Sequence, residues 1–283
     1  MFRAPLSAIG LTATILVSGL VSGLAADTTE IVADRDNTLF ESGDGELSSG
    51  SGRTFYAGRI NFEENGFVER RGILHFDLSS IPEGADVISA SVRVQVTKVP
   101  PLPPTGLSFF LHRCLADWGE GSSSSFGGDG APSTTNDATW LHGFYPGVTW
   151  SNPGGDFDAA PSGTTIMDGL GSYTFTGAGL AADVQSWIDG NDNHGWVMIG
   201  DVSEPRTVRQ IASREYAIAS QRPTLIVEWE VGGIPGDFNG DARVDAVDLG
   251  LLLVGWSSAG ETDLNGDGTT NAEDLGLLLV NWG

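Results

Sequence analysis

Oxygen-bearing side chains recur at alternate positions in two segments near the C-terminus. One segment runs from Asp237 to Asp248 and the other from Asp263 to Asp274. Calcium is a hard cation that takes six to eight oxygen ligands, and a loop of this spacing supplies them from positions 1, 3, 5, 7, 9 and 12. The expected side-chain donors are Asp237, Asn239, Asp241, Asp245 and Asp248, then Asp263, Asn265, Asp267, Asn271 and Asp274, with the backbone carbonyls of Arg243 and Thr269 at position 7. The sequence therefore predicts two Ca²⁺ ions; the alternative is a pair of solvated acidic turns.

Each loop leads into an apolar segment, Leu249–Trp256 and Leu275–Trp282, which we expect to be helical. The first of these helices is apolar almost all round, so it must be buried against its twin, the rest of the protein or a partner. The loops differ at position 6, where Ala242 stands in the first and Gly268 in the second.

The segment from Asp237 to Trp282 resembles a type I dockerin module, in which each of two calcium loops is followed by a helix and ends in Asp. The resemblance implies attachment to a cohesin on a scaffold that carries polysaccharide-degrading proteins. Cohesin-binding helices of that family carry polar and basic residues, whereas the first helix here is apolar. The expected partner is therefore left open between a cohesin-like protein and a cell-surface protein.

The N-terminus predicts secretion. Arg3 precedes an apolar run over 9–24 that ends in Ala25 and Ala26, which is typical of a signal peptide cleaved after residue 26. A membrane anchor is the alternative, but the run is short and broken by glycine. We expect an extracellular or cell-surface protein that does not bind a membrane after cleavage.

The overall charge restricts the partners. The chain has 37 acidic and 14 basic residues and a net charge of −23. Such a chain repels nucleic acid and anionic membranes, so we expect neither as a partner.

Composition and periodicity divide the mature chain into a mainly β domain over 27–231, a short linker over 232–236 and the calcium module over 237–283. The segment 87–99 alternates apolar and polar residues, as a strand with one buried face does. One helix is expected over 180–188, with Leu180, Val184 and Trp187 on its buried face and Asp183 pointing away. Many short strands joined by long loops predict a β-sandwich.

Several motifs of the large domain resemble the DNRLRE-domain family of bacterial secreted proteins. The matching motifs are 70–85, 88–94, 117–121, 195–200, 213–215 and 222–225. The resemblance implies a jelly-roll β-sandwich. It also implies carbohydrate binding, because some relatives are binding modules attached to enzymes that act on alginate-like acidic polysaccharides.

Two groups of residues are candidates for binding such a polysaccharide, which would be a uronic one. Arg70 and Arg214 belong to clusters of arginines that could form paired hydrogen bonds with uronate carboxylates; the alternative is that they form structural ion pairs. Trp118, Trp140 and Trp150 lie in the long segment 117–171 and could stack on sugar rings; the alternative is packing of that loop onto the sandwich.

No catalytic residue is expected. Asp117 and Glu120 form a conceivable carboxylate pair for glycoside hydrolysis, but nothing beyond residue type supports them. The sequence contains no His-Glu-x-x-His, Gly-x-Ser-x-Gly or phosphate-loop motif. The expected function is that of a secreted, non-catalytic polysaccharide-binding protein, docked through its calcium module and associated with polysaccharide catabolism. The alternatives are a structural or adhesive surface protein without a sugar ligand and, less favoured, a glycoside hydrolase or lyase.

Overall fold

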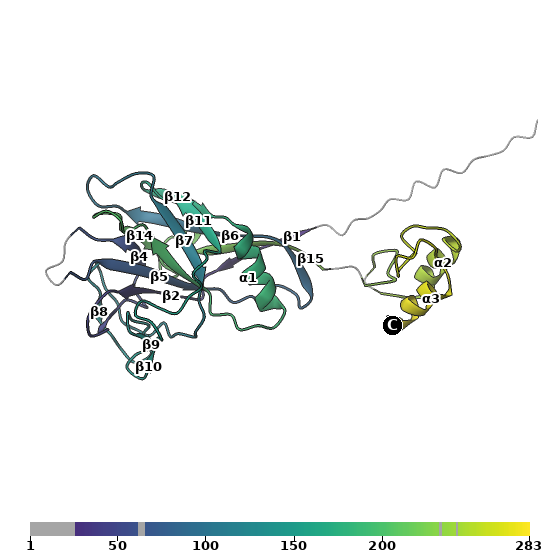
Figure 1. The fold of residues 1–283 in the computed structure, drawn as a ribbon, viewed down its shortest axis with the longest axis horizontal. Helices are drawn as coiled ribbons and strands as arrows, with labels where there is room; N and C mark the ends of the chain where they lie inside the picture. The colour runs from purple at the N-terminus through teal and green to yellow at the C-terminus, as the bar shows by residue number, and fades with distance from the viewer. Residues whose placement is uncertain (1–25, 62–65, 232–233, 242) are drawn as a thin grey trace, which may run out of the picture. The chain divides into compact units, whose positions relative to one another are not determined.

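The computed structural model describes residues 26–61, 66–231, 234–241 and 243–283. The described residues form two compact units, a β unit over 26–231 and a C-terminal unit over 234–283 (Figure 1). The predicted signal peptide up to residue 25, residues 232–233 of the predicted linker and Ala242 of the first loop lie outside the described residues.

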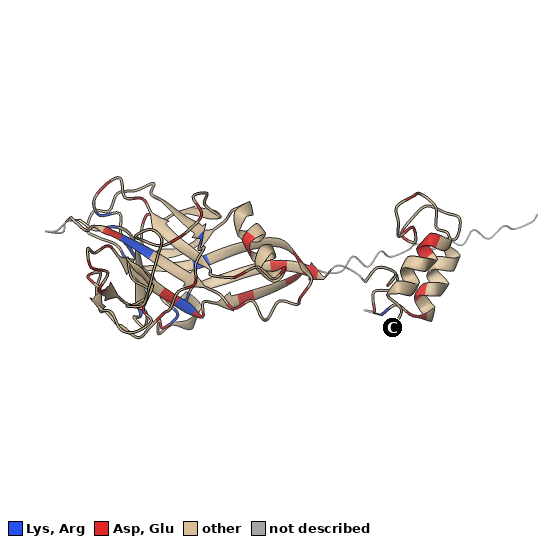
Figure 2. Cartoon of the chain, turned by 60° about the horizontal axis from the view of Figure 1, so that its bottom comes forward, with Lys and Arg blue, Asp and Glu red and all other residues tan. Residues whose placement is uncertain are grey.

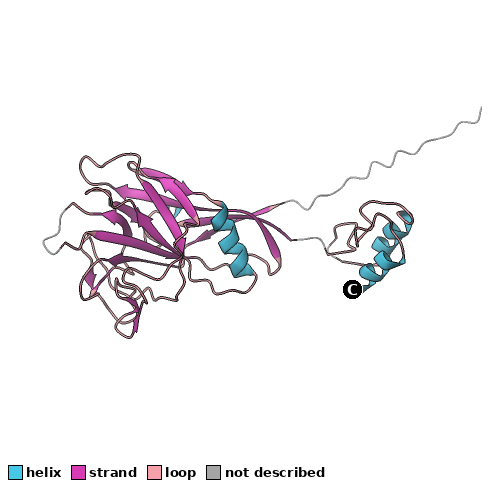
Figure 3. Cartoon of the chain, in the orientation of Figure 1, coloured by secondary structure: helices cyan, strands magenta, loops and turns pink. Residues whose placement is uncertain are grey.

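The β unit is built on one large, curled antiparallel sheet (Figure 3). Its hydrogen-bonded path runs β1-β15-β6-β14-β4-β5-β13-β7-β11, while β12 pairs with β6 and β2 pairs with β5. The bounds are β1 Asp27–Val32, β2 Arg35–Phe40, β4 Thr54–Arg59, β5 Glu69–His75, β6 Ala85–Lys98, β7 Ser108–Arg113, β11 Gly163–Ile166, β12 Gly171–Phe175, β13 Trp196–Gly200, β14 Arg209–Ala212 and β15 Thr224–Val231. Two small ribbons pair β3 (Leu47–Ser48) with β8 (Ala131–Pro132) and β9 (His142–Phe144) with β10 (Val148–Thr149).

The alternating segment is confirmed as the long strand β6. Val92, Val94 and Val96 are buried, and the residues between them are partly exposed, because successive side chains of a strand point to opposite faces. The buried face belongs to the main core, which also contains Phe55 and Trp196. The prediction of a mainly β domain is therefore confirmed.

The predicted helix is α1, Ala178–Ile188, and it buries Leu180, Val184 and Trp187 as expected. The expectation that Asp183 points away from the core is wrong. Its carboxylate is buried and accepts a hydrogen bond from the indole Nε1 of Trp196 at 2.8 Å. A buried indole N–H needs an acceptor, and Asp183 supplies it.

A second core lies beneath the long segment that follows β7. Leu39, Ile73 and Val197 come from β2, β5 and β13, and three tryptophans of the long segment pack against them. Cys114 is buried in the same cluster, and burial raises the pKa of its thiol to about 12. The long loop is therefore an integral part of the β unit.

The C-terminal unit contains two equivalent helices, α2 (Ala246–Val254) and α3 (Ala272–Val280). Each begins with a capping box, in which the side chain at loop position 9 caps the helix and the position 12 carboxylate accepts a backbone N–H in return. A small core of Val244, Leu252 and Leu278 joins the helices. Both helices start earlier than predicted because the last residues of each calcium-type loop already form the first helical turn.

Among the described residues, no helix is long and apolar enough to cross a bilayer.

Candidate functional site

The first acidic loop curls its side chains back onto its own backbone. Asp237 Oδ1 accepts hydrogen bonds from the backbone N–H groups of Gly240 and Asp241, and Asp241 Oδ1 accepts one from Arg243. Asn239 Nδ2 donates to Asp241 Oδ2 at 3.0 Å. The tips of the side chains at positions 3 and 5 therefore meet on the inner side of the loop.

The second loop repeats this geometry and extends it to position 9. Asn265 Nδ2 lies 3.1 Å from Asp267 Oδ2, and Asn271 Nδ2 lies 3.4 Å from the same oxygen and 2.9 Å from the carbonyl oxygen of Thr269. Asp263 accepts from the backbone N–H groups of Asp267 and Gly268. Positions 3, 5, 7 and 9 of this loop are thus gathered around one point.

The final aspartate of each loop is fully buried. Asp248 Oδ1 accepts from the backbone N–H groups of Phe238 and Asn239, and its Oδ2 accepts from that of Asp245. Asp274 makes the same bonds to Leu264, Asn265 and Asn271. Burial raises the pKa of Asp274, but these backbone donors outweigh that effect and hold the pKa below its ordinary value.

The donor set has the chemistry that calcium requires. The converging groups are carboxylates, side-chain amides and a backbone carbonyl, and their oxygens are the hard donors that calcium takes. Within the part of the chain that the structure describes, no group of three or more His, Cys, Asp or Glu side chains is arranged to hold a metal ion. A calcium ion in these loops would take part of its coordination shell from Asn at position 3, from the position 7 carbonyl and, in the second loop, from Asn271 at position 9.

The glycines of the loops have the backbone angles that such a loop needs. Gly240 and Gly266 at position 4 have φ of 74° and 72°, and Gly268 at position 6 of the second loop has φ of 91°. Residues with a Cβ atom disfavour these positive φ angles, whereas glycine adopts them readily. The counterpart of Gly268 in the first loop, Ala242, lies outside the described residues.

In the β unit, Arg70 is a structural residue and has no exposed surface to offer a glycan. Its side chain is fully buried, donates to the backbone carbonyls of Gly128 and Glu69, and lies against the Phe40 ring at 5.3 Å. The expectation that Arg70 contacts a polysaccharide is therefore corrected. The neighbouring Arg71 points the other way, pairs with Glu69 and stacks on Trp140.

Arg214 is also committed to neighbours. Its Nε and Nη2 donate to the two oxygens of Glu120 at 2.6 and 2.7 Å, and Nε lies 2.8 Å from Glu215. The carboxylates of Glu120 and Glu215 therefore occupy the guanidinium N–H groups with which Arg214 was expected to bind a uronate. The structural ion pair, which was the alternative interpretation, is the arrangement observed.

The three candidate tryptophans are buried rather than presented to solvent. Trp118 is completely enclosed and donates from Nε1 to the carbonyl of His194, while Trp150 donates to that of Thr139. Trp140 lies beneath the guanidinium of Arg71. Their expected role as sugar-stacking platforms is corrected to packing of the long loop onto the sheet.

Asp117 and Glu120, the conceivable catalytic pair, are engaged with different partners. Asp117 accepts from Arg35 and from its own neighbour Trp118, whereas Glu120 is held by Arg214 and by the backbone N–H of Asp36. Each carboxylate thus has its own structural partners.

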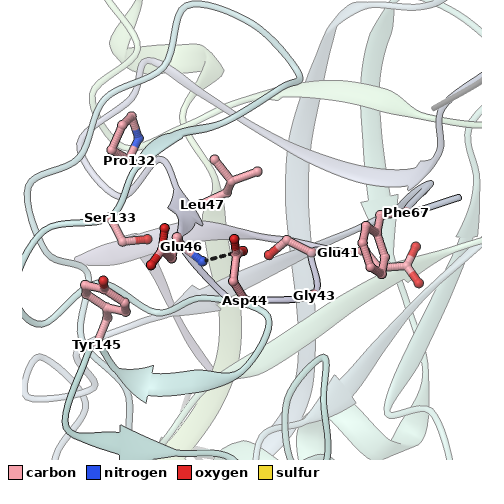
Figure 4. A pocket seen from close by; sticks show the side chains of 10 residues that line it. Glu41, Gly43, Asp44, Glu46, Leu47, Phe67, Pro132, Ser133 and Tyr145 are labelled. Carbon is pink, nitrogen blue, oxygen red and sulfur yellow. Dashed lines mark hydrogen bonds between the residues drawn. The ribbon is translucent and has the colours of Figure 1, made fainter. Parts of the chain in front are cut away.

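One pocket of the β unit is lined by carboxylates. Figure 4 shows Glu41, Asp44 and Glu46 around a pocket of about 340 Å³, with Phe67 and Tyr145 at its sides. Glu41 is held by the backbone N–H groups of Val68 and Glu69. No basic residue is among the described residues that line this pocket, so its charge disfavours an acidic polysaccharide.

A second pocket, of about 190 Å³, has the opposite character and was not anticipated from the sequence. Its lining comprises Tyr56, Lys98, Val99, Pro100, Pro101, Phe126, Gly127, Gly128, Val208 and Gln210. The signals present in the sequence were the single lysine of the chain and a lone phenylalanine in a Gly- and Ser-rich stretch.

No protein-family model and no curated protein matches this chain in the comparisons made.

Proposed function

We propose that this chain is a secreted, non-catalytic polysaccharide-binding protein with a C-terminal module that binds two calcium ions and attaches the protein to a partner. The observation that carries the proposal is the duplicated loop geometry. Twice, polar side chains at alternate loop positions converge while a fully buried aspartate ties the loop to the following helix.

Calcium binding would complete the folding of the C-terminal unit. Three buried apolar residues form the core among the unit's described residues, and a core of this size stabilises little by itself. Each loop also gathers several carboxylates, whose mutual repulsion is relieved by a divalent cation. The arrangement of residues is similar to that of a type I dockerin.

The attachment surface would be the outer sides of the two helices. Leu251, Leu253 and Val254 of α2 are exposed, as are Leu279 and Val280 of α3, with Val254 at 86% and Val280 at 79% exposure. Exposed apolar groups on two neighbouring elements mark an interaction surface. A cohesin-like or cell-surface protein is the partner that this surface suggests.

Polysaccharide binding would belong to the β unit. Its curled antiparallel sheet and long, ordered loops fit the jelly-roll sandwich that the DNRLRE-like motifs suggest. Figure 2 places the basic residues almost entirely in this unit, since Arg243 is the one Lys or Arg after residue 233. Basic groups in an otherwise acidic chain support an acidic ligand.

The test is a binding scan of the mature chain against soluble neutral and uronic polysaccharides, with calcium and with a chelator. Binding of a uronic polysaccharide without turnover supports the proposal. Absence of binding to every glycan favours a structural or adhesive surface protein, and release of reducing ends or unsaturated sugars indicates a hydrolase or lyase.

A further inference from the structure

A row of three side chains crosses the sheet at the second pocket. Tyr56 on β4 lies directly opposite Gln210 on β14, and Gln210 lies opposite Lys98 at the end of β6. Directly opposed residues of antiparallel strands share a face of the sheet, and all three line the same pocket. An aromatic hydroxyl, an amide and an ammonium group are therefore placed side by side.

The polar groups of this row are already held in place. Gln210 Nε2 donates to the Tyr56 hydroxyl oxygen at 2.6 Å, and Thr97 Oγ1 donates to Gln210 Oε1 at 3.0 Å. Tyr56 itself is almost fully buried and packs against Phe40. A fixed amide and hydroxyl can recognise the hydroxyl groups of a ligand with little loss of side-chain entropy.

The walls of the pocket are apolar and stiff. Val99, Pro100 and Pro101 follow the end of β6, and Phe126 is fully exposed on another loop that lines the pocket. An aromatic ring with no protein contact on its faces can stack on the C–H face of a sugar. Pockets for drug-sized ligands measure about 300–1,000 Å³, so this smaller pocket suits a single ring.

Lys98 gives the pocket its charge. Among the described residues it is the only charged one that lines the pocket, and none of them forms an ion pair with it within 4 Å. Its side chain is exposed. In a chain with a net charge of −23, an ammonium group in a pocket whose described lining holds no Asp or Glu favours an anionic substituent. The carboxylate-lined pocket of Figure 4 offers the contrast within the same unit.

We propose that the pocket formed by Tyr56, Lys98, Phe126 and Gln210 binds one sugar ring of an anionic polysaccharide. Phe126 stacks on the ring, Tyr56 and Gln210 bind its hydroxyl groups, and Lys98 pairs with its carboxylate or sulfate. This inference rests on the proposed polysaccharide binding. It places the binding site at this pocket instead of at the buried residues Arg70 and Trp118.

The experiment measures binding of short oligogalacturonates, dextran sulfate and cello-oligosaccharides to the full mature chain by calorimetry, at one fixed calcium concentration. The variants are Lys98→Met, Lys98→Arg, Phe126→Ala and Phe126→Tyr. Matched controls are Arg53→Met, an exposed cation elsewhere, and Leu170→Ala, an exposed apolar side chain outside the pocket.

We expect Lys98→Met and Phe126→Ala each to weaken binding of the anionic ligand about tenfold or more, because each removes one principal contact. Lys98→Arg and Phe126→Tyr retain most of the affinity, and the controls bind as the wild type does. The oligogalacturonate and dextran sulfate arms tell whether the anionic group is a carboxylate or a sulfate.

Three outcomes overturn the inference. Wild-type binding that is unchanged in both Lys98→Met and Phe126→Ala refutes this site and leaves polysaccharide binding intact. Preferred binding of the neutral cello-oligosaccharides refutes the anionic ligand. Absence of wild-type binding to all three ligands refutes the site and the proposed function together.

Discussion

Arg214 and Glu120 form a two-pronged ion pair, with Nε to Oε1 at 2.6 Å and Nη2 to Oε2 at 2.7 Å. The pair joins the segment after β14 to the long loop that follows β7. Asp36 on β2 enters the same cluster, since its Oδ2 accepts the backbone N–H of Arg214 and its own N–H donates to Glu120. The guanidinium of Arg214 thus pairs with the carboxylates of Glu120 and Glu215, and its backbone N–H donates to that of Asp36.

We expect Arg214→Ala to lower the free energy of unfolding of the β unit by about 2 kcal/mol. Breaking a fully buried ion pair costs about 3–5 kcal/mol, but the side chain of Arg214 is 38% exposed and that of Glu120 is 14% exposed, so water screens part of the loss. Urea unfolding followed by tryptophan fluorescence measures the change. Arg53→Ala is the control, with a change within about 0.5 kcal/mol. Equal stability of Arg214→Ala and Arg53→Ala would contradict this role.

The buried Asp36 predicts a pH dependence of stability. Burial and the nearby carboxylates of Glu215 and Glu120 raise its pKa well above the ordinary value of 3.8, and its Oδ1 has no hydrogen-bond partner among the described residues. The folded protein therefore holds this proton to a higher pH than the unfolded chain does. Between the two pKa values the folded state binds more protons, so the free energy of unfolding falls as pH rises.

Asp36→Asn removes this titration while keeping the shape of the side chain. We expect its free energy of unfolding to depend less on pH from about pH 4 upward, and the variant to be at least as stable as the wild type at neutral pH. Burial also raises the pKa of Glu215, so part of the slope persists in the variant. Identical slopes in the two proteins would show that Asp36 is ionised throughout this range.

Because the candidate tryptophans are buried, we expect their replacement to lower the stability of the β unit without specifically weakening polysaccharide binding. Trp118→Ala removes a fully enclosed ring and its hydrogen bond to His194, and we expect a cost of about 3–5 kcal/mol. Phe126→Ala, by contrast, changes stability by less than about 0.5 kcal/mol because the ring is exposed. A Trp118→Ala protein that unfolds like the wild type but no longer binds polysaccharide would restore Trp118 as a ligand residue.

The division into two units predicts independent responses to chelation. We expect EDTA, or Asp237→Ala and Asp263→Ala, to lower the melting temperature of the C-terminal unit and to leave that of the β unit unchanged. Scanning calorimetry of the full chain measures both transitions. Glu261→Ala is the matched control, because it removes an exposed carboxylate from the same unit outside both loops. A single transition that shifts as a whole on chelation would show that the units unfold together.

Periodicity was sufficient to predict the most regular elements. The alternation of Val92, Val94 and Val96 indicated β6, and the spacing of Leu180, Val184 and Trp187 indicated α1. Strands β2 and β4 were not anticipated, since both faces of each are largely buried and no alternation results. A strand covered by the sheet core on one side and by a loop on the other carries no period-two signal.

The residues of the candidate sites divide in the same way, between those that local spacing predicts and those that depend on tertiary structure. Local spacing within one loop was enough to place the oxygens of Asp263, Asn265 and Asp267 together. Residues that meet through tertiary structure could not be assigned in this way. An Arg or a Trp in the sequence is compatible both with ligand binding and with structural packing. Only the fold of the 117–171 segment over the sheet shows which role Arg70 and Trp118 have. The row of Tyr56, Lys98 and Gln210 likewise depends on strand register.

Titration of the metal-free mature chain with calcium tests the central claim most directly. We expect isothermal titration calorimetry to give two bound ions per chain, with one lost in Asp237→Ala, one lost in Asp263→Ala and none lost in Glu261→Ala. A wild-type chain that binds no calcium, or a stoichiometry that neither loop variant changes, would contradict the assignment of the two acidic loops as calcium sites.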